Sequence, residues 1–200
     1  ELMQVDRIQL HKDLLQKVKG TTDEQIQYSP ERLEGVIDLV VEKSNWGKTK
    51  EGVYQGFAVY YCHNTHVAEV ADIEMENGYP VVKKVTCAVD CGIVVNPLGA
   101  NNQVVGGIID GIGHTMYGEL NFNEGIPQSN NFNSYQLIRI HQTPQVDVHF
   151  VDNNIAPTGL GEPALPPVGG AIANAIYAAT RQRLLKQPYM KHYQPEKIIG

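Results

Sequence analysis

A glycine-rich loop carries the residue with the clearest chemical potential in this sequence. Residues 158–164 read Thr-Gly-Leu-Gly-Glu-Pro-Ala, which places Glu162 between Gly161 and Pro163. Glycine lets the backbone approach a ligand closely and proline restricts the backbone, so a carboxylate between them is held in position. In an apolar surrounding, such a carboxylate can act as a general base. A simple surface-loop glutamate stays open as the alternative on spacing alone.

The same loop fits the loose dinucleotide-binding pattern Gly-x-Gly-x-x-Ala. That fold requires a hydrophobic strand directly before the first glycine and an unbroken helix after it. No such strand leads into Gly159. The helix would be interrupted by three prolines, Pro163, Pro166 and Pro167. We therefore interpret the loop as a carrier for Glu162 and not as a nicotinamide or flavin site.

A second glycine-rich segment, residues 101–117, has apolar residues at helical spacing and contains Gln103. Four glycines lie in this expected helix: Gly106, Gly107, Gly111 and Gly113. Each costs a helix roughly 1 kcal/mol relative to alanine, so close packing or a closely bound ligand should compensate. The start of a helix suits a phosphate or pyrophosphate. Gln103, expected in the first turn, offers amide donors and an acceptor to a polar ring or an oxo ligand.

Cysteine and histidine raise the question of a metal site. The candidates are Cys62, His63, His66, Cys87 and Cys91. Their spacings do not match zinc patterns, and strand neighbours such as Cys62 and His63 should point to opposite faces. Buried cysteines and surface histidines are the favoured interpretation, and no residue is predicted to ligate a metal directly. An odd number of cysteines also cannot complete a disulfide framework.

Composition restricts the classes of function. The 200 residues are 42% hydrophobic and 19% charged, as in folded proteins. A net charge of −6 disfavours nucleic-acid binding, which needs a basic face, so small molecules or protein surfaces are the expected partners. There is no membrane-length apolar run and no signal-peptide pattern at the N-terminus, so a soluble piece is expected. Because the sequence does not begin with Met, we expect an upstream part; the compartment stays open, with the periplasm favoured over the cytoplasm.

The elements that must position these residues form an α+β pattern. Helices are expected at residues 6–19, at 30–41 after the capping pair Ser29-Pro30, at 101–117 and from 171 to 179. Strands are expected at 52–63, 67–75, 81–89, 137–140 and 146–151. Asn77-Gly78 predicts a hairpin turn between two of them. Residues 152–170, with four prolines and four glycines, predict a long ordered loop.

Three segments together resemble the closing third of the xanthine oxidase family of molybdenum hydroxylases. They are residues 89–97 (Val-Asp-Cys-Gly-Ile-Val-Val-Asn-Pro), 103–113 (Gln-Val-Val-Gly-Gly-Ile-Ile-Asp-Gly-Ile-Gly) and 159–163 (Gly-Leu-Gly-Glu-Pro). Their order and spacing match as well, and the resemblance covers about residues 30–180. Residues 128–132 and 166–176 are most similar to isoquinoline 1-oxidoreductase beta subunits, with aldehyde dehydrogenases of the same organisation as close relatives.

The resemblance implies an α+β molybdopterin-binding domain with mixed or antiparallel strands and packed helices. The implied cofactor is molybdenum with molybdopterin cytosine dinucleotide. Gln103 matches the glutamine that contacts the pterin or the molybdenum ligands, and Gly106, Gly107 and Gly161 match the cofactor-binding glycines. Glu162 matches the family's base, which accepts a proton from the oxygen that attacks the substrate. The implied reaction hydroxylates an N-heteroaromatic compound or oxidises an aldehyde, with water as the oxygen source.

The resemblance also implies an assembly. Three scattered cysteines cannot hold the iron–sulfur clusters that remove the electrons. A small subunit with two [2Fe–2S] clusters and the remaining part of the large subunit are therefore expected partners, besides a small-molecule substrate. Because the family's upstream cofactor motif and pocket residues are missing, the 200 residues alone should be inactive and without the cofactor.

The expected division is an N-terminal helical segment (1–29), the C-terminal part of the molybdopterin domain (30–186) and a polar tail (187–200). The competing function is a cofactor-free assembly or partner-binding domain with the same fold. Retention of both Gln103 and Glu162 favours the enzyme.

Overall fold

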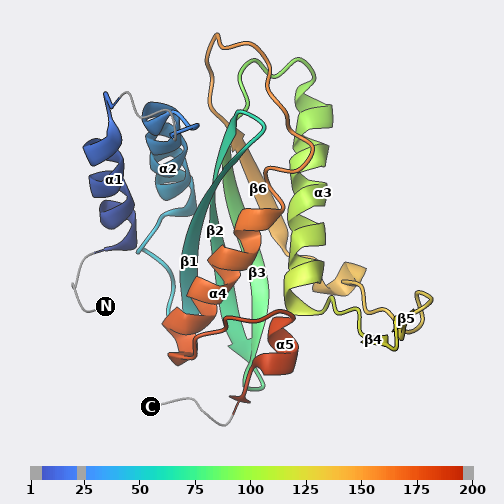
Figure 1. The fold of residues 1–200 in the computed structure, drawn as a ribbon. Coiled ribbons are helices and arrows are strands. Elements are labelled where there is room, and N and C mark those ends of the chain that lie inside the picture. Colours follow the sequence, from blue (N-terminus) through green and yellow to red (C-terminus); the bar gives the residue numbers. More distant parts are fainter. Residues whose placement is uncertain (1–5, 22–25, 196–200) are drawn as a thin grey trace.

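The computed structural model describes residues 6–21 and 26–195. Its centre is a four-stranded sheet of order β1-β2-β3-β6, accompanied by a two-stranded hairpin, β4-β5 (Figure 1). The strands are β1 (Val53–Cys62), β2 (Thr65–Glu76), β3 (Tyr79–Asp90), β4 (Phe122–Asn123), β5 (Ile126–Pro127) and β6 (Gln145–Phe150). The helices are α1 (Arg7–Val18), α2 (Pro30–Ser44), α3 (Pro97–Met116), α4 (Pro166–Thr180), α5 (Tyr189–His192) and the 3₁₀ helix η1 (Ile140–Gln142).

The three long strands form an antiparallel meander, and β6 joins β3 in parallel. Asn77-Gly78 forms the β2–β3 turn with φ of 50° and 82°, which confirms the predicted hairpin. The β1–β2 turn is formed by His63-Asn64, also with positive φ, 50° and 60°. Parallel pairing requires a long crossover, and α3 with the segment after it supplies the crossover from β3 to β6.

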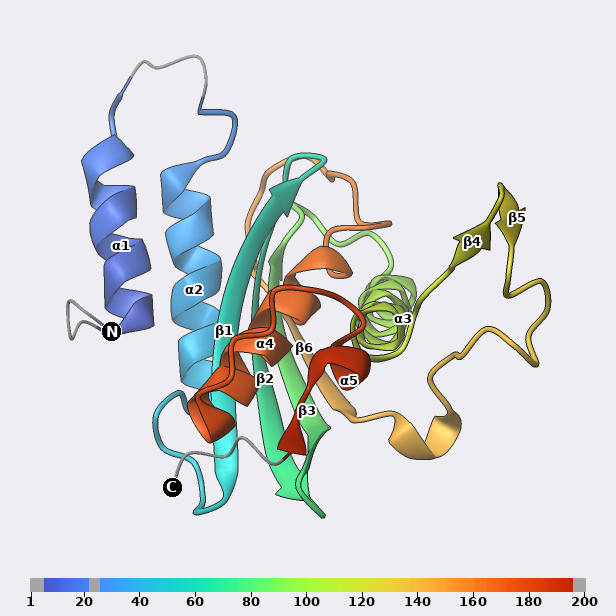
Figure 2. The same ribbon diagram turned by 60° about the horizontal axis from the view of Figure 1, so that its bottom comes forward.

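Helices cover both faces of the sheet (Figures 1 and 2). Since strand residues alternate between faces, Val67 of β2 packs in the core under α3 and α4, whereas Val70 packs in the core under α1 and α2. Ile172 of α4 is fully buried in the first core and Ile37 of α2 in the second. The resulting helix–sheet–helix layers confirm the expected α+β fold with mixed strands and packed helices.

The helix that carries Gln103 begins earlier than predicted. Asn96 caps α3 by accepting a hydrogen bond from the Gly99 amide at 3.0 Å, and Pro97 is the first helical residue. Asn96-Pro97 therefore starts the helix, four residues before the predicted start at residue 101. Gln103 consequently lies in the second turn, away from the free N–H groups of the helix start, so its predicted first-turn position is wrong.

The region before α4 also differs from the prediction. Residues 137–139 are irregular and Ile140 begins η1, so the strand expected at 137–140 is absent. The long loop ends at Leu165, because Pro166 and Pro167 occupy the first positions of α4, where a helix needs no N–H donor. Two of the three prolines that argued against a helix in this segment, Pro166 and Pro167, thus begin one.

The last segment is not simply a polar tail. Residues 189–192 form α5, and the side chains of Tyr189 and Tyr193 are buried, 6% and 5% exposed, in the core under α3 and α4. The Tyr189 hydroxyl donates to the backbone oxygen of Gly169 at 3.1 Å. The described part of this segment therefore fastens the end of the chain to α4; residues 196–200 lie outside the described residues.

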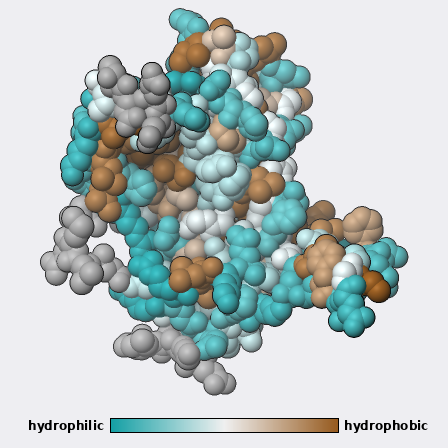
Figure 3. All heavy atoms as spheres, in the orientation of Figure 1, coloured by the Kyte–Doolittle hydropathy of each residue, from teal (hydrophilic) through white to brown (hydrophobic). Residues whose placement is uncertain are grey.

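Between α3 and β6 the chain forms an arm, residues 118–139, that projects from the body (Figures 1 and 2). Its hairpin strands are two residues long. Phe122, Ile126 and Phe132 on the arm are 61%, 65% and 74% exposed, and brown side chains gather at the arm in Figure 3. The arm thus presents apolar surface that the described chain leaves uncovered.

Glu69 is a fully buried carboxyl group in the middle of β2. Its neighbours across the sheet are Ala58 of β1 and Cys87 of β3, and it shares the α4 side of β2 with Val67 and Ala71. Among the described residues neither carboxyl oxygen has a hydrogen-bond partner stronger than the Cys87 thiol, a weak donor. Burial raises the pKa of Glu69 well above its ordinary value, which favours the neutral acid in the folded protein.

This buried acid predicts a pH-dependent stability. In the unfolded chain a glutamate loses its proton at about pH 4.3, whereas burial raises the pKa of the folded Glu69 well above that value. The free energy of unfolding should therefore fall as pH rises from there towards the folded pKa, by up to about 1.4 kcal/mol per pH unit. Replacing Glu69 by Met, similar in volume and apolar, should remove this loss and stabilise the protein more at pH 8 than at pH 5.

Urea unfolding between pH 5 and pH 8 tests this expectation. Glu69→Gln is the matched control, because it cannot ionise but keeps an unpartnered buried polar group. It should share the flattened pH profile of Glu69→Met and gain less stability. Parallel pH profiles of the parent and both variants would show that Glu69 is already ionised in the folded state.

Candidate functional site

The loop that carries Glu162 is fastened to the β1–β2 turn. The Gly159 amide donates to the backbone oxygen of His63 at 3.1 Å. Thr65 Oγ1 lies 2.6 Å from both Gly159 O and Thr158 Oγ1. A hydroxyl has one proton, so Thr65 donates to the Gly159 carbonyl and Thr158 donates to Thr65. Thr65 is fully buried, so these bonds hold the loop against the sheet without competition from water.

Gly159 is required by this contact. A Cβ built on Gly159 would stand 2.6 Å from the Cβ of His63, closer than real side chains come. Only glycine lets the loop lie this close to the turn. The first glycine of the Gly-Leu-Gly-Glu motif therefore lets the loop backbone pack directly against His63.

Gln103 meets the same loop from the α3 side. Its side-chain nitrogen donates to the backbone oxygen of Gly161 at 2.8 Å, so two residues 58 positions apart are joined directly next to Glu162. Gln103 and Gly161 are both exposed. The structure thus brings Gln103, Gly161 and Glu162 together at one edge of the molecule.

Glu162 itself is in a more open setting than the sequence suggested. Its side chain is 76% exposed, so the expected apolar surrounding is wrong for the described chain. One carboxylate oxygen lies 3.1 Å from Nε2 of His63, and its backbone oxygen accepts from the Leu165 amide at 2.9 Å. Backbone and side chain are therefore both fixed by neighbours, while the carboxylate faces outward.

The helix glycines divide into two kinds. Gly111 is a packing glycine, because a Cβ there would lie 2.6 Å from Leu165 O and from a methyl carbon of Val168. Gly106 is exposed, and outside its own helix no atom of the described residues lies within 4 Å of a Cβ built on it. The same holds for Gly161, whereas Gly107 is in ordinary contact with the loop near Leu165. Open space therefore adjoins Gly106 and Gly161, as a bulky ligand would require.

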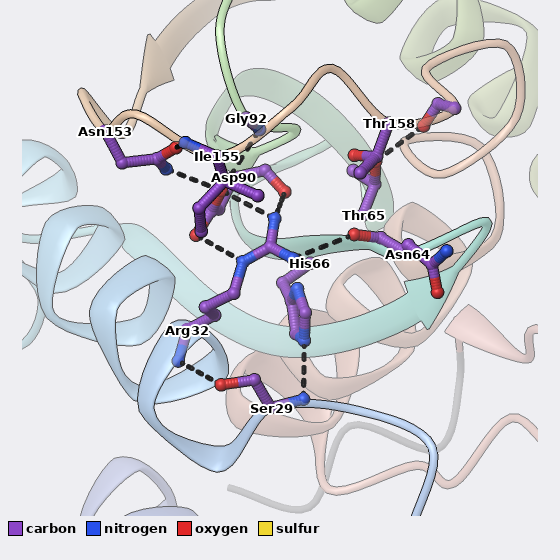
Figure 4. Close-up of polar contacts among 11 residues, drawn as sticks. Ser29, Arg32, Asn64, Thr65, His66, Asp90, Gly92, Asn153, Ile155 and Thr158 are labelled. Carbon is purple, nitrogen blue, oxygen red and sulfur yellow. Dashed lines mark hydrogen bonds and ion pairs between the residues drawn. The ribbon is translucent and has the colours of Figure 1, made fainter.

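Behind the loop lies a polar cluster that the sequence did not reveal (Figure 4). Arg32 of α2 donates to both carboxylate oxygens of Asp90, at 2.8 and 2.9 Å, and to the backbone oxygen of Asn64 at 3.1 Å. Asn153 and the Gly92 amide donate to the same carboxylate at 2.9 and 3.3 Å. This cluster ties α2, the β1–β2 turn, Gly92 and the start of the long loop at Asn153 to the end of β3.

The electrostatics of the cluster follow from burial and pairing. Burial acts to raise the pKa of Asp90, but hydrogen bonds from Arg32, Asn153 and Gly92 outweigh it and hold the pKa below its ordinary value. Beside it, burial and then the Arg32 charge lower the pKa of His66 to about 4. His66 is therefore neutral near pH 7, and its Nε2 accepts from the Ser29 amide at 3.0 Å, at the cap of α2.

Only part of this cluster could be predicted from the sequence. Asp90 and Gly92 lie in a motif singled out above, but nothing in the local pattern pairs them with Arg32, 58 positions away from Asp90.

The cysteines are free, with Cys62 half-buried and Cys87 and Cys91 buried. Within residues 6–21 and 26–195, no group of three or more His, Cys, Asp and Glu side chains could hold a metal ion. None of the helices in these ranges has the length and apolar character needed to cross a bilayer.

The fold is similar to that of a solved oxidoreductase. The chain matches the structure of quinoline 2-oxidoreductase from Pseudomonas putida 86 with a TM-score of 0.58 and 21% identity. The match covers 67% of this chain and 18% of the other. This likeness concerns the fold alone.

Sequence comparison extends the similarity to curated relatives. The chain is 33% identical over 169 residues to a membrane-bound aldehyde dehydrogenase of Gluconacetobacter polyoxogenes, whose name specifies pyrroloquinoline quinone, covering 78% of this chain and 21% of that protein. It is 33% identical over 159 residues to the beta subunit of isoquinoline 1-oxidoreductase of Brevundimonas diminuta, covering 76% and 20%. The chain thus spans about a fifth of the length of these relatives.

A family model described as a molybdopterin cofactor-binding domain matches residues 8–144. The matched range includes Gln103, Gly106 and Gly107, and Glu162 follows it. These findings confirm the resemblance that the three motifs carry. The chain belongs to the molybdopterin cofactor-binding domain family of the molybdenum hydroxylases.

Proposed function

We propose that this chain is part of a molybdenum hydroxylase large subunit that hydroxylates an N-heteroaromatic compound or oxidises an aldehyde, with water as the oxygen source. The observation that carries the proposal is the 2.8 Å hydrogen bond from Gln103 to Gly161, which joins two family motifs directly beside Glu162. The relatives named for an aldehyde and for isoquinoline support the two substrate classes.

The residues at this edge fit a bulky cofactor. Open space adjoins Gly106 and Gly161, and Gln103 holds the loop while its amide lies exposed beside that space. When bound, the molybdenum cofactor would supply two-electron redox chemistry. Glu162 would accept a proton from the water-derived oxygen that attacks the substrate, since a fixed carboxylate can serve as a general base. The hydrogen bond from Gln103 to the Gly161 carbonyl and the bond from the Gly159 amide to His63 would hold the loop, and with it that carboxylate, in place.

The cytosine dinucleotide form of the cofactor is part of the proposal, and analysis of the purified full-length subunit tests it. We expect molybdenum and, after acid hydrolysis, a cytidine nucleotide in equal amounts. One relative is named for pyrroloquinoline quinone, so this quinone is assayed in the same sample. Bound quinone without molybdenum would refute the proposed cofactor.

Gly106→Ala separates cofactor binding from folding. The new methyl group would meet no described atom outside its helix, and alanine favours a helix by roughly 1 kcal/mol over glycine. We therefore expect the full-length variant to unfold at the same temperature or higher, yet to hold less molybdenum per subunit, because the methyl group occupies the ligand's space.

Gly111→Ala is the matched control on the same helix. Its methyl group would collide with Leu165 O and Val168, so stability should fall whether or not a cofactor binds. Thermal unfolding and molybdenum content of the two variants are compared. An unchanged molybdenum content in Gly106→Ala would show that the cofactor does not lie against α3 at this point.

Further parts of the proposal concern the assembly. We propose a small iron–sulfur partner subunit with two [2Fe–2S] clusters, a periplasmic location, and residues 30–186 as the share of the molybdopterin domain in this chain. The apolar side chains of the arm, Phe122, Ile126 and Phe132, support contact with the remaining part of the large subunit. The same exposed arm favours the competing function, a cofactor-free assembly domain, which predicts no molybdenum in the full-length subunit.

A further inference from the structure

We propose that His63 is a positioning residue for Glu162: it holds the carboxylate in the orientation that proton transfer requires. This inference rests on the proposed function of Glu162 as the base. Sequence reasoning treated His63 as an ordinary surface histidine or a weak metal candidate, and neither interpretation involves Glu162.

The first support is the contact itself. Nε2 of His63 lies 3.1 Å from a carboxylate oxygen of Glu162, across 99 positions of sequence. A carboxylate can only accept, so Nε2 carries the proton and donates it in this bond. The two side chains are 58% and 76% exposed. A long glutamate side chain in this setting would otherwise sample several rotamers, and one charge-assisted bond selects among them.

The second support is the backbone of His63. Its φ is 50°, in the left-handed region, at the first position of the β1–β2 turn. Glycine and asparagine adopt this conformation at little cost, and Asn64 occupies the next position with φ of 60°. A histidine here is less favourable for the turn than asparagine or glycine would be. Histidine nevertheless tolerates the left-handed region better than most residue types, so the turn accepts His63 while its ring contacts Glu162.

The third support is that both the backbone and the side chain of His63 contact the loop that carries Glu162. The His63 carbonyl accepts from the Gly159 amide at 3.1 Å, three residues before Glu162, and the missing side chain of Gly159 leaves room for the His63 Cβ. The backbone of His63 thus sets where the loop lies, and its ring sets where the Glu162 carboxylate points. The turn itself is held from behind by Arg32, which donates to the Asn64 carbonyl.

The variants are chosen to remove the donor without harming the turn. His63→Asn keeps a residue that tolerates positive φ, but its shorter side chain cannot reach the Glu162 carboxylate in the same way. His63→Gln is the rescue variant, because its amide nitrogen can donate over a similar reach. In the full-length subunit we expect His63→Asn to keep its molybdenum content and unfolding temperature while turnover per molybdenum falls about 10- to 100-fold, the size of effect that misplacing a catalytic group produces. His63→Gln should recover part of that loss.

A purely structural role for His63 predicts the opposite, namely lower stability or lower molybdenum content with unchanged turnover per molybdenum. The double variant with Glu162→Gln adds a second criterion. If His63 acts through Glu162, His63→Asn should reduce turnover by less than about twofold once the base is gone, because interacting residues are not additive. An undiminished loss in that background would overturn the inference.

The pairing is also tested without catalysis. In the full-length subunit with selectively labelled histidine and glutamate, nuclear Overhauser contacts between the His63 ring protons and the Glu162 side chain should be present and should vanish in His63→Asn. Their absence in the parent would overturn the inference whatever the enzyme does. Full turnover of His63→Asn beside an inactive Glu162→Gln would refute only the role of His63. Full turnover of Glu162→Gln would refute the proposed base, and the role of His63 with it.

Discussion

Replacing Glu162 by Gln in the full-length subunit should reduce turnover per molybdenum atom by about 10²–10⁴, the range that general base catalysis contributes. Gln keeps the size of the side chain, and its amide oxygen can still accept from His63, 3.1 Å from the carboxylate in the parent. It cannot take up a proton. Molybdenum content and unfolding temperature should therefore stay near those of the parent while the chemical step fails.

The measurement is turnover per molybdenum with an aldehyde and with an N-heteroaromatic substrate. Glu51→Gln is the matched control, because Glu51 is an exposed glutamate just before β1, at the far end of the strand from the β1–β2 turn. It should change turnover little. If Glu162→Gln stays within a factor of about three of the parent, far below the range of a general base, Glu162 does not act as one.

The second large effect is expected from Arg32→Met. This change leaves Asp90, whose side chain is 3% exposed, without its charged partner. Breaking a buried ion pair by removing one member costs about 3–5 kcal/mol, because an uncompensated buried charge remains. The free energy of unfolding should fall by that amount near pH 7. The hydrogen bond to the Asn64 carbonyl is lost as well, so the β1–β2 turn should loosen.

The pH dependence of this loss has a definite sign. The pKa of Asp90 is held below its ordinary value in the folded protein, so its stabilising contribution is present above the unfolded pKa of about 3.9 and is lost as pH falls through the folded pKa. The difference between parent and Arg32→Met should therefore shrink as pH falls below about 4. A loss that does not change with pH would show that packing of the arginine stem, and not the charge pair, causes it.

Denaturant unfolding with two further variants makes this test sharper. Asp90→Asn in the Arg32→Met background should restore part of the stability, because it removes the stranded charge. Lys43→Met is the surface control: Lys43 and Glu42 form an ion pair with side chains 39% and 70% exposed. Its removal should cost no more than about 1 kcal/mol. Equal losses in Arg32→Met and Lys43→Met would contradict the importance assigned to the buried pair.

The parts of the fold that the sequence predicted are those with local causes. Ser29 caps α2 and Pro30 begins it, and apolar residues at helical spacing bury one face. Asn77-Gly78 marks its hairpin because both residues accept positive φ. In each case the signal lies within a few residues of the structure it specifies.

The parts that sequence did not predict depend on distant pairs. The parallel pairing of β6 with β3 joins segments about 60 positions apart, such as Lys84 with Gln145, and no local pattern encodes it. The β1–β2 turn was hidden because His63 is not a turn-forming residue type. The contact between His63 and Glu162 could not be predicted because 99 positions separate the two residues and no local pattern joins them. The family resemblance indicated Gln103 and Glu162 as partners in one site, but not the hydrogen bond through Gly161 that joins them.

The bonds from Thr65 and His63 to the loop have a consequence for how catalysis would respond to temperature. Both residues bind Gly159, which lies three residues before Glu162. The loop is therefore already held against β2 and the β1–β2 turn once the protein has folded. The conformational entropy of the loop is then lost during folding and not during each turnover. The proposed base should accordingly need no loop closure when substrate arrives, and the activation entropy of the reaction should be small. An Arrhenius plot of turnover should stay straight until the temperature at which the whole domain unfolds.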